Sequence, residues 1–332
     1  MLKNKLLLLI PALLCVLHGR AQFAPQATMP GSDAIPAGSS LFTAWASHCE
    51  VQRGYMDIAD PTLGMVNAGL PEHATGSPDG SIVSLGDSGI AVLTFPVYIT
   101  NGPGADFAVF ENGFPNPGNP AEAFLELAFV EVSSDGEHFF RFPAQSLTQA
   151  DSQISSIAGQ DYMDAALLNN LAGKYIAGYG VPFDLQELDG TTGLDINRIT
   201  HVRIVDVIGT IGVHGTNDVN GHRINDPYPT AFPAGGFDLD AVGVIHGSPL
   251  SVEDARLAQV RVFPNPAHDF ITISLPRQQV FQLTIRNAAG QTVWQQPISG
   301  AGKVAVSQLP AGVYFVQLQN ETQSCVTRFI RP

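Results

Sequence analysis

The stretch Phe237-Asp-Leu-Asp-Ala-Val-Gly-Val-Ile-His246 has the alternating pattern of a β-strand, with two acidic residues near its start. Side chains along a strand point alternately to its two faces. Asp238 and Asp240 are therefore expected on the same face as Val242 and Val244. A face that carries two valines should be buried, so the pattern predicts carboxylates inside the molecule.

A second expected strand, at 201–207, repeats the pattern. There Asp206 falls on the same face as Val202 and Ile204. An ionised carboxylate taken out of water costs several kcal/mol unless something neutralises it. These two strands indicate that the interior must hold positive charge from some source.

The rest of the segment 22–247 reads as further strands with long, irregular connections. Asp135-Gly136 is a hairpin turn signal. One helix is expected at 161–172, with Asp161 as its cap and Gly173 at its end. The pattern predicts an all-β, jelly-roll-like β-sandwich. The expected strands are 81–85, 90–95, 107–110, 125–133, 139–142, 201–207 and 237–246.

Charge separates this segment from the one that follows it. The chain has 332 residues and a net charge of −14. Residues 22–255 carry six basic and 28 acidic residues, whereas residues 256–332 carry seven basic and two acidic residues. Such asymmetry indicates separate units, with a linker expected at 248–256. The acidic balance argues against binding to nucleic acid.

The segment 257–332 reads as a second, smaller β domain. Seven short strands separated by Pro, Gly and Asn turns predict an immunoglobulin-like β-sandwich. The expected strands are 260–264, 269–275, 280–287, 291–296, 303–307, 312–319 and 324–330.

The N-terminal residues have the pattern of a secretory signal peptide, expected at 1–21. Lys3 and Lys5 precede an apolar run, and Ala21 stands at the expected cleavage position. No later run is long enough to span a bilayer, so no transmembrane segment is expected in the mature chain. Of the two cysteines that remain, Cys49 and Cys325, a bridge is one option and two thiols the other.

Four motifs of the tail resemble one known family. They are Val262-Phe-Pro-Asn-Pro-Ala267, Asn287-Ala-Ala-Gly-Gln-Thr-Val293, Leu309-Pro-Ala-Gly-Val-Tyr314 and Arg328-Phe-Ile-Arg331. Together they resemble the C-terminal sorting domain of the type IX secretion system of Bacteroidota. The resemblance implies that residues 257–332 engage the secretion machinery and that the protein is secreted or held at the outer cell surface.

The segment before the tail is similar to uncharacterised Bacteroidota cell-surface proteins with a galactose-binding-like jelly roll. The similarity to those proteins runs through Asp106-Phe-Ala-Val-Phe-Glu-Asn-Gly113 and 235–244, and the resemblance to galactose-binding-like jelly rolls runs through Phe129–Phe139 and 236–242. Some of those proteins accompany cobalamin-uptake genes. The resemblance implies a ligand class, a glycan or a corrinoid nutrient, without identifying contact residues.

The buried carboxylates are best explained by a bound cation. Segment 22–247 has only six Lys and Arg residues, too few to pair with its acids. Ca²⁺ accepts carboxylate, amide and backbone oxygens together, so a structural Ca²⁺ site is expected. The alternative is that these residues are ordinary solvated turn acids. The expected ligands are drawn from Asp206, Asp218, Asn220, Asp226, Asp238 and Asp240, with Glu111 and Asn112 as weaker candidates.

Aromatic side chains suggest where a ligand could be held. Tyr175, Tyr179 and Phe183 lie in a Gly-rich segment, and exposed rings there could stack on a sugar or a planar cofactor. The alternative is that the rings pack into the core.

The sequence favours a secreted ligand-binding protein that performs no chemistry, with no catalytic residue expected. Two alternatives stay open. One is a hydrolase that acts on polysaccharide through paired carboxylates, for which Glu111, Glu126 and Glu131 are candidates. The other is a purely structural surface protein.

Overall fold

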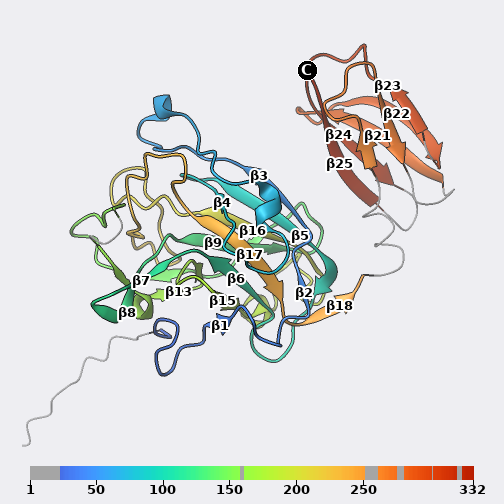
Figure 1. Ribbon diagram of the computed structural model, residues 1–332. Helices are drawn as coiled ribbons and strands as arrows, with labels where there is room; N and C mark the ends of the chain where they lie inside the picture. The colour runs from blue at the N-terminus through green and yellow to red at the C-terminus, as the bar shows by residue number, and fades with distance from the viewer. Residues whose placement is uncertain (1–22, 158–160, 251–260, 275–279, 301, 320–323) are drawn as a thin grey trace, which may run out of the picture. The chain divides into compact units, whose positions relative to one another are not determined.

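The computed structural model describes residues 23–157, 161–250, 261–274, 280–300, 302–319 and 324–332. The expected signal peptide and residues 251–260 lie outside these ranges. The chain divides into two compact units, Met1–Thr94 with Asn101–His246, and Phe95–Thr100 with Gly247–Pro332. The fold is all-β, as the sequence predicts: the described residues form strands and short 3-10 turns (Figure 1).

Two large sheets form the framework of the first unit. In one, the strands are ordered β1-β15-β6-β17-β2, with β4 also paired to β17. Strands β6 and β17 lie in its middle and are buried along their whole length, which explains the nearly continuous apolar run of β6. The strands of this sheet are β1 (Ile35–Pro36), β2 (Ala44–Trp45), β4 (Val83–Ser84), β6 (Phe107–Glu111), β15 (Tyr179–Phe183) and β17 (Asp238–Val244).

The other large sheet has the order β10-β9-β16-β5, with β14 on β9 and β3 on β5. In β16, Val202, Ile204 and Asp206 are buried while the residues between them are half-exposed, as strand alternation predicts. Its strands are β3 (His48–Gln52), β5 (Ile90–Ile99), β9 (Ala128–Ser133), β10 (Phe140–Arg141), β14 (Leu171–Ala172) and β16 (Ile199–Asp206).

Smaller elements complete the first unit. They are β7 (Phe114–Asn116), β8 (Asn119–Phe124), β11 (Gln145–Ser146), β12 (Met163–Asp164) and β13 (Leu168–Asn169), with the 3-10 turns η1 (Pro61–Leu63), η2 (Pro71–Ala74), η3 (Ala165–Leu167) and η4 (Leu185–Leu188). Within the described ranges, no helix has the length and hydropathy that a bilayer crossing needs.

The helix expected at 161–172 is wrong. Asp164 caps only the three-residue turn η3, and the residues around it pair with neighbouring strands. Leu168 pairs with Ser146, and Leu171 pairs with Phe129. Both leucines are fully buried in these positions. The two leucines are thus buried by pairing with neighbouring strands and not by packing one face of a helix. Tertiary contacts here override local helix propensity.

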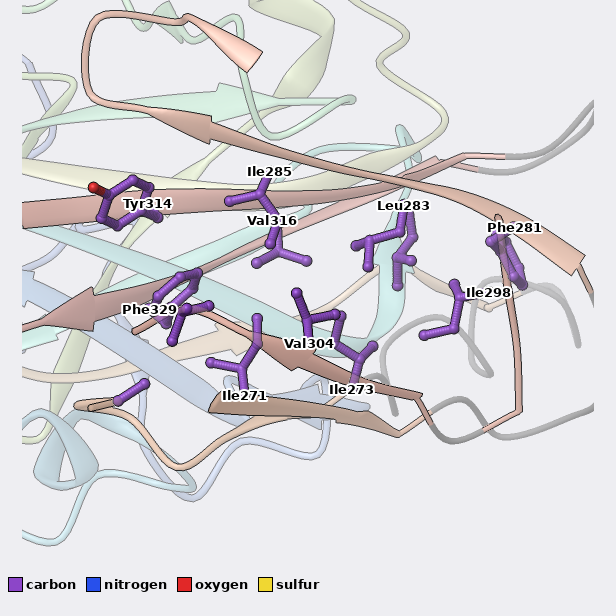
Figure 2. Close-up of a cluster of buried hydrophobic side chains, with 13 residues drawn as sticks. Ile271, Ile273, Phe281, Leu283, Ile285, Ile298, Val304, Tyr314, Val316 and Phe329 are labelled. Atoms are coloured by element: carbon purple, nitrogen blue, oxygen red, sulfur yellow. The ribbon is translucent and has the colours of Figure 1, made fainter. Parts of the chain in front are cut away.

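The second unit contains the tail sandwich. Strands β19 (Arg261–Phe263), β20 (Phe270–Ser274) and β23 (Gly302–Ala305) form one sheet. The other has the order β22 (Thr292–Ser299), β21 (Val280–Asn287), β24 (Gly312–Gln319) and β25 (Ser324–Arg331). Figure 2 shows their inner side chains meeting in one core, in which Tyr314 stacks on Phe329. All seven expected strands are therefore present, in two packed sheets.

The chain that follows His246 begins with a strand rather than with a linker. Strand β18 (Gly247–Pro249) pairs with Val97–Ile99 of β5, so the expected linker at 248–256 starts inside a sheet. Cys49 and Cys325 are both thiols in the structure. Burial raises the pKa of Cys49 to about 12 and that of Cys325 to about 11, which makes both poor nucleophiles at neutral pH.

Candidate functional site

Five carboxylates from five separate segments gather in the interior of the first unit. Glu111 ends β6, Asp206 ends β16, Asp238 begins β17, and Glu126 and Asp226 lie on connecting segments. None is more than 8% exposed. We call these five residues the carboxylate cluster.

The members of the cluster act on one another electrostatically. Burial raises the pKa of Glu126 well above its ordinary value, and the charges of Asp238, Glu111, Asp226 and Asp206 raise it further. Burial likewise raises the pKa of Asp226, with Asp206 as the next cause. These shifts mean that the site disfavours five negative charges in the absence of a compensating cation.

Two members accept a hydrogen bond on each of their carboxylate oxygens. Asp206 accepts the backbone N–H groups of Phe237 at 2.7 Å and Ser88 at 3.1 Å, one on each oxygen. Asp238 accepts the Ser84 hydroxyl on one oxygen and the Asn112 side-chain amide at 2.9 Å on the other. These hydrogen bonds fix the two carboxylates in place without neutralising them.

Other oxygen atoms of the cluster have no partner. Glu111 accepts the Gly113 N–H at 2.7 Å on Oε2, but its buried Oε1 accepts nothing. Asp226 accepts the Leu127 N–H at 3.2 Å on Oδ2, and its buried Oδ1 accepts nothing. A buried acceptor left unpaired is costly, so these atoms point to a partner that the polypeptide does not supply.

Protein cations do not balance the cluster. Within the described ranges, none of the five carboxylates forms an ion pair. The charge of Arg53 lowers the pKa of Asp238, but its guanidinium donates to the backbone carbonyls of Ala68, Gly69 and Ser84. The buried acid Glu131 contrasts with the cluster, because Arg141 and Arg203 both pair with it. Glu131 thus differs from the five cluster carboxylates in having two cationic partners.

The six metal ligands expected from sequence separate into two sets. Asp206, Asp226 and Asp238 belong to the cluster. Asp218 instead accepts the backbone N–H groups of Ser146, Asn220 and His222, and the Asn220 side chain is exposed. Asp218 closes its own loop and Asn220 faces solvent, so neither reaches the cluster through these contacts.

Asp240 stands at a β-bulge, is buried, and its charge helps to raise the pKa of Glu111 after burial and Asp238. Leu239 pairs with Glu111 but Ala241 pairs with Phe110, so Asp240 is an extra residue in β17. Its carboxyl accepts the backbone N–H groups of Asp79 and Gly80 at 3.2 and 3.3 Å. The bulge interrupts the regular alternation of β17 next to Asp238.

The cluster supplies oxygen atoms only, the type that a hard cation such as Ca²⁺ prefers. Glu111, Glu126, Asp206, Asp226 and Asp238 would be the side chains that hold it, with Asn112 beside Asp238. In the described part of the chain, no three His, Cys, Asp or Glu side chains are already arranged around one metal position. Occupancy would therefore require the unpartnered oxygens of Glu111 and Asp226 to turn toward the ion.

The aromatic residues expected to hold a ligand do not form an exposed shelf. Tyr175 is 1% exposed and donates its hydroxyl to Asp33. Phe183 is 1% exposed and stacks on Phe107 with ring centroids 5.3 Å apart. Only Tyr179 is partly exposed. The alternative reading, that these rings pack inward, holds for Tyr175 and Phe183.

Comparison with known proteins identifies the tail. Residues 261–331 match the family model of the secretion system C-terminal sorting domain. The tail is thus a type IX secretion sorting domain, and the protein is exported to the extracellular space or the outer cell surface. No curated protein matches the chain.

Solved structures give only remote similarity. A β-glucuronidase from Ruminococcus gnavus in complex with D-glucaro 1,5-lactone is 11% identical, with 88% of this chain and 44% of that chain covered and a TM-score of 0.20. A putative beta-galactosidase from Bacteroides fragilis is 13% identical, covering 86% of this chain and 40% of that chain, also at 0.20. The chain spans less than half the length of these proteins.

Proposed function

We propose that the first unit is an extracellular ligand-binding module whose carboxylate cluster holds a structural Ca²⁺ ion. The observation that carries the cation is the set of buried carboxylates with unpartnered oxygens on Glu111 and Asp226. A divalent cation would offset the like charges and give these oxygens a partner in a single step. Ca²⁺ then joins the ends of β6, β16 and β17, which hold the surrounding loops.

The ligand of the module is a glycan or a corrinoid nutrient, and the module performs no chemistry. Export through the type IX system delivers it to the place where such ligands are met. A glycosidase needs a carboxylate pair that reaches its substrate. Glu111 and Glu126, the two candidate acids in the carboxylate cluster, are 2% and 8% exposed, which favours a structural role for them over hydrolysis.

A binding screen of the full chain tests this function. The chain is offered to immobilised glycans and to cyanocobalamin, in Ca²⁺ and after treatment with a chelator. Ligand binding predicts capture of at least one probe in Ca²⁺ and weaker capture after chelation. Polysaccharide hydrolysis that Glu111→Gln abolishes would contradict the proposal and favour a hydrolase. Absence of both binding and hydrolysis would favour a structural surface protein.

A further inference from the structure

A cavity of about 280 Å³ lies in the first unit, apart from the carboxylate cluster. Its polar lining is Asp33, Asn169, Asn170, Lys174, Asp184 and Glu187. Strands β1 and β15 supply an apolar wall through Ile35, Val181 and Pro182. A few convergent polar groups against an apolar wall are typical of a small-molecule site.

Lys174 is the unusual member of this lining. It is 3% exposed, and it lines the cavity together with Asp33, Asp184 and Glu187. The Tyr175 ring lies 5.2 Å from Nζ. Burial lowers the pKa of Lys174 to about 8, although Asp33 and Asp164 act in the opposite direction. A ligand atom that accepts a hydrogen bond from this largely desolvated ammonium would gain affinity, because hydrogen bonds to charged groups are the stronger ones.

The acidic residues of the cavity offer acceptors in return. Glu187 accepts the Asn170 side-chain amide at 2.6 Å on Oε2, and Asp184 accepts the Gln186 N–H at 2.9 Å on Oδ1. Asp33 accepts the Tyr175 hydroxyl on Oδ1. The second oxygen of each carboxylate takes no hydrogen bond from the described residues, and is open to a donor on a ligand.

The charge of the lining restricts the ligand class. Three carboxylates against one ammonium disfavour an anion. Neighbouring hydroxyls of a sugar ring can accept from Lys174 and donate to Asp184 and Glu187, because a hydroxyl does both. The volume is slightly below the usual range for drug-sized ligands of about 300–1,000 Å³, which suits one sugar ring and not a whole corrinoid.

We propose that this cavity binds a single neutral sugar residue, with Lys174 as the hydrogen-bond donor and Asp184 and Glu187 as acceptors. The inference rests on the proposed ligand-binding function and narrows its ligand to the glycan class. The carboxylate cluster plays no part in these contacts.

The four lysines of the chain make the test direct. The full chain is labelled with ¹³C-lysine, and the εCH₂ resonance of Lys174 is assigned by its loss in Lys174→Arg. Methyl glycosides of glucose, galactose, mannose, xylose and N-acetylglucosamine are titrated, then cyanocobalamin. We expect at least one glycoside to shift the Lys174 resonance saturably while that of Lys303, in the tail, stays unchanged.

Variants make the assignment independent of the spectrum. Lys174→Met and Glu187→Gln should each weaken glycoside binding at least tenfold, whereas the matched control Lys303→Met should leave it unchanged. If a glycoside binds but does not shift the Lys174 resonance, and neither variant weakens its binding, this site would be overturned. The ligand-binding function would still stand. Binding of cyanocobalamin alone would overturn the sugar class. Binding of no probe would overturn both proposals.

Discussion

The Oδ1 atom of Asp206 accepts the backbone N–H of Phe237 at 2.7 Å. This bond ties the end of β16 to the residue before β17, two strands that belong to different sheets. Gly236 stands next to this contact, where a Cβ atom would lie 2.7 Å from Asp206 Oδ1. The position also has φ +71°, so it requires glycine both for backbone conformation and for space.

Asp226→Asn should raise the free energy of unfolding in chelator and reduce the further gain that Ca²⁺ gives. In chelator the variant loses a buried like charge while its amide oxygen still accepts the Leu127 N–H. We expect it to be more stable than the parent by about 1–3 kcal/mol. In Ca²⁺ it should be stabilised less than the parent, because a ligand is weakened. Urea unfolding in both conditions measures this.

Asp218→Asn is the matched control, because Asp218 caps three backbone N–H groups outside the cluster. It should destabilise the chain equally with Ca²⁺ and with chelator. A Ca²⁺ response altered by Asp218→Asn and unaltered by Asp226→Asn would place the ion in the loop instead.

Glu131→Gln should destabilise the first unit by about 1–3 kcal/mol in either condition, because Arg141 and Arg203 lose their shared carboxylate. The two tryptophans make the measurement specific, since one is Trp45 in the first unit and the other is Trp294 in the tail. In a Trp294→Phe background, fluorescence follows the first unit alone. An unchanged unfolding midpoint would show that the ion pairs of Glu131 contribute nothing to stability.

The pH dependence of stability should carry a contribution from Lys174. Its pKa in the folded chain is about 8, below its ordinary value of 10.5, so between these values the unfolded chain binds more protons. The free energy of unfolding therefore rises with pH across this window, by about 3 kcal/mol from this group. The free energy of unfolding of Lys174→Met should exceed that of the parent by the largest amount near pH 7, and this difference should shrink toward pH 10. A difference that is independent of pH would contradict the buried ammonium.

Phe329→Ala should disable export by unfolding the tail sandwich. Phe329 is fully buried and its ring stacks on Tyr314 with centroids 5.3 Å apart. Truncating a buried Phe costs about 3–5 kcal/mol, a large share of the stability of a small domain. In a host with a type IX system, fractionation should find the variant retained inside the cell envelope. Secretion at the parent level would contradict a need for a folded tail.

Much of the fold could be predicted because it depends on local alternation. Strands β21 and β24 begin and end where the sequence pattern places them, and Asp206 is buried as its parity in β16 requires. The helix at 161–172 was wrong because Leu168 and Leu171 find partners on strands that are distant in sequence, which no local pattern records.

The site was only partly predictable for the same reason. Asp240 stands in a bulge that depends on how β17 pairs with β6, so its hydrogen-bond partners could not be read from strand parity. Glu126 was missed as a possible ligand, although it is the single acid in the apolar run Phe124-Leu-Glu-Leu-Ala-Phe129 and that isolation is a usable signal. Lys174 gives no sequence signal, since its burial arises only when β1, β15 and η4 surround one cavity.

Calorimetric titration of Ca²⁺ into the chelator-treated full chain, paired with thermal unfolding, tests the calcium proposal most directly. We predict a saturable heat and a rise in melting temperature, both strongly reduced in Glu111→Gln and Asp226→Asn. A folded, chelator-treated chain that gives no heat and an unchanged melting temperature would contradict the proposal, and would mean that the buried carboxylates are neutralised by protons alone.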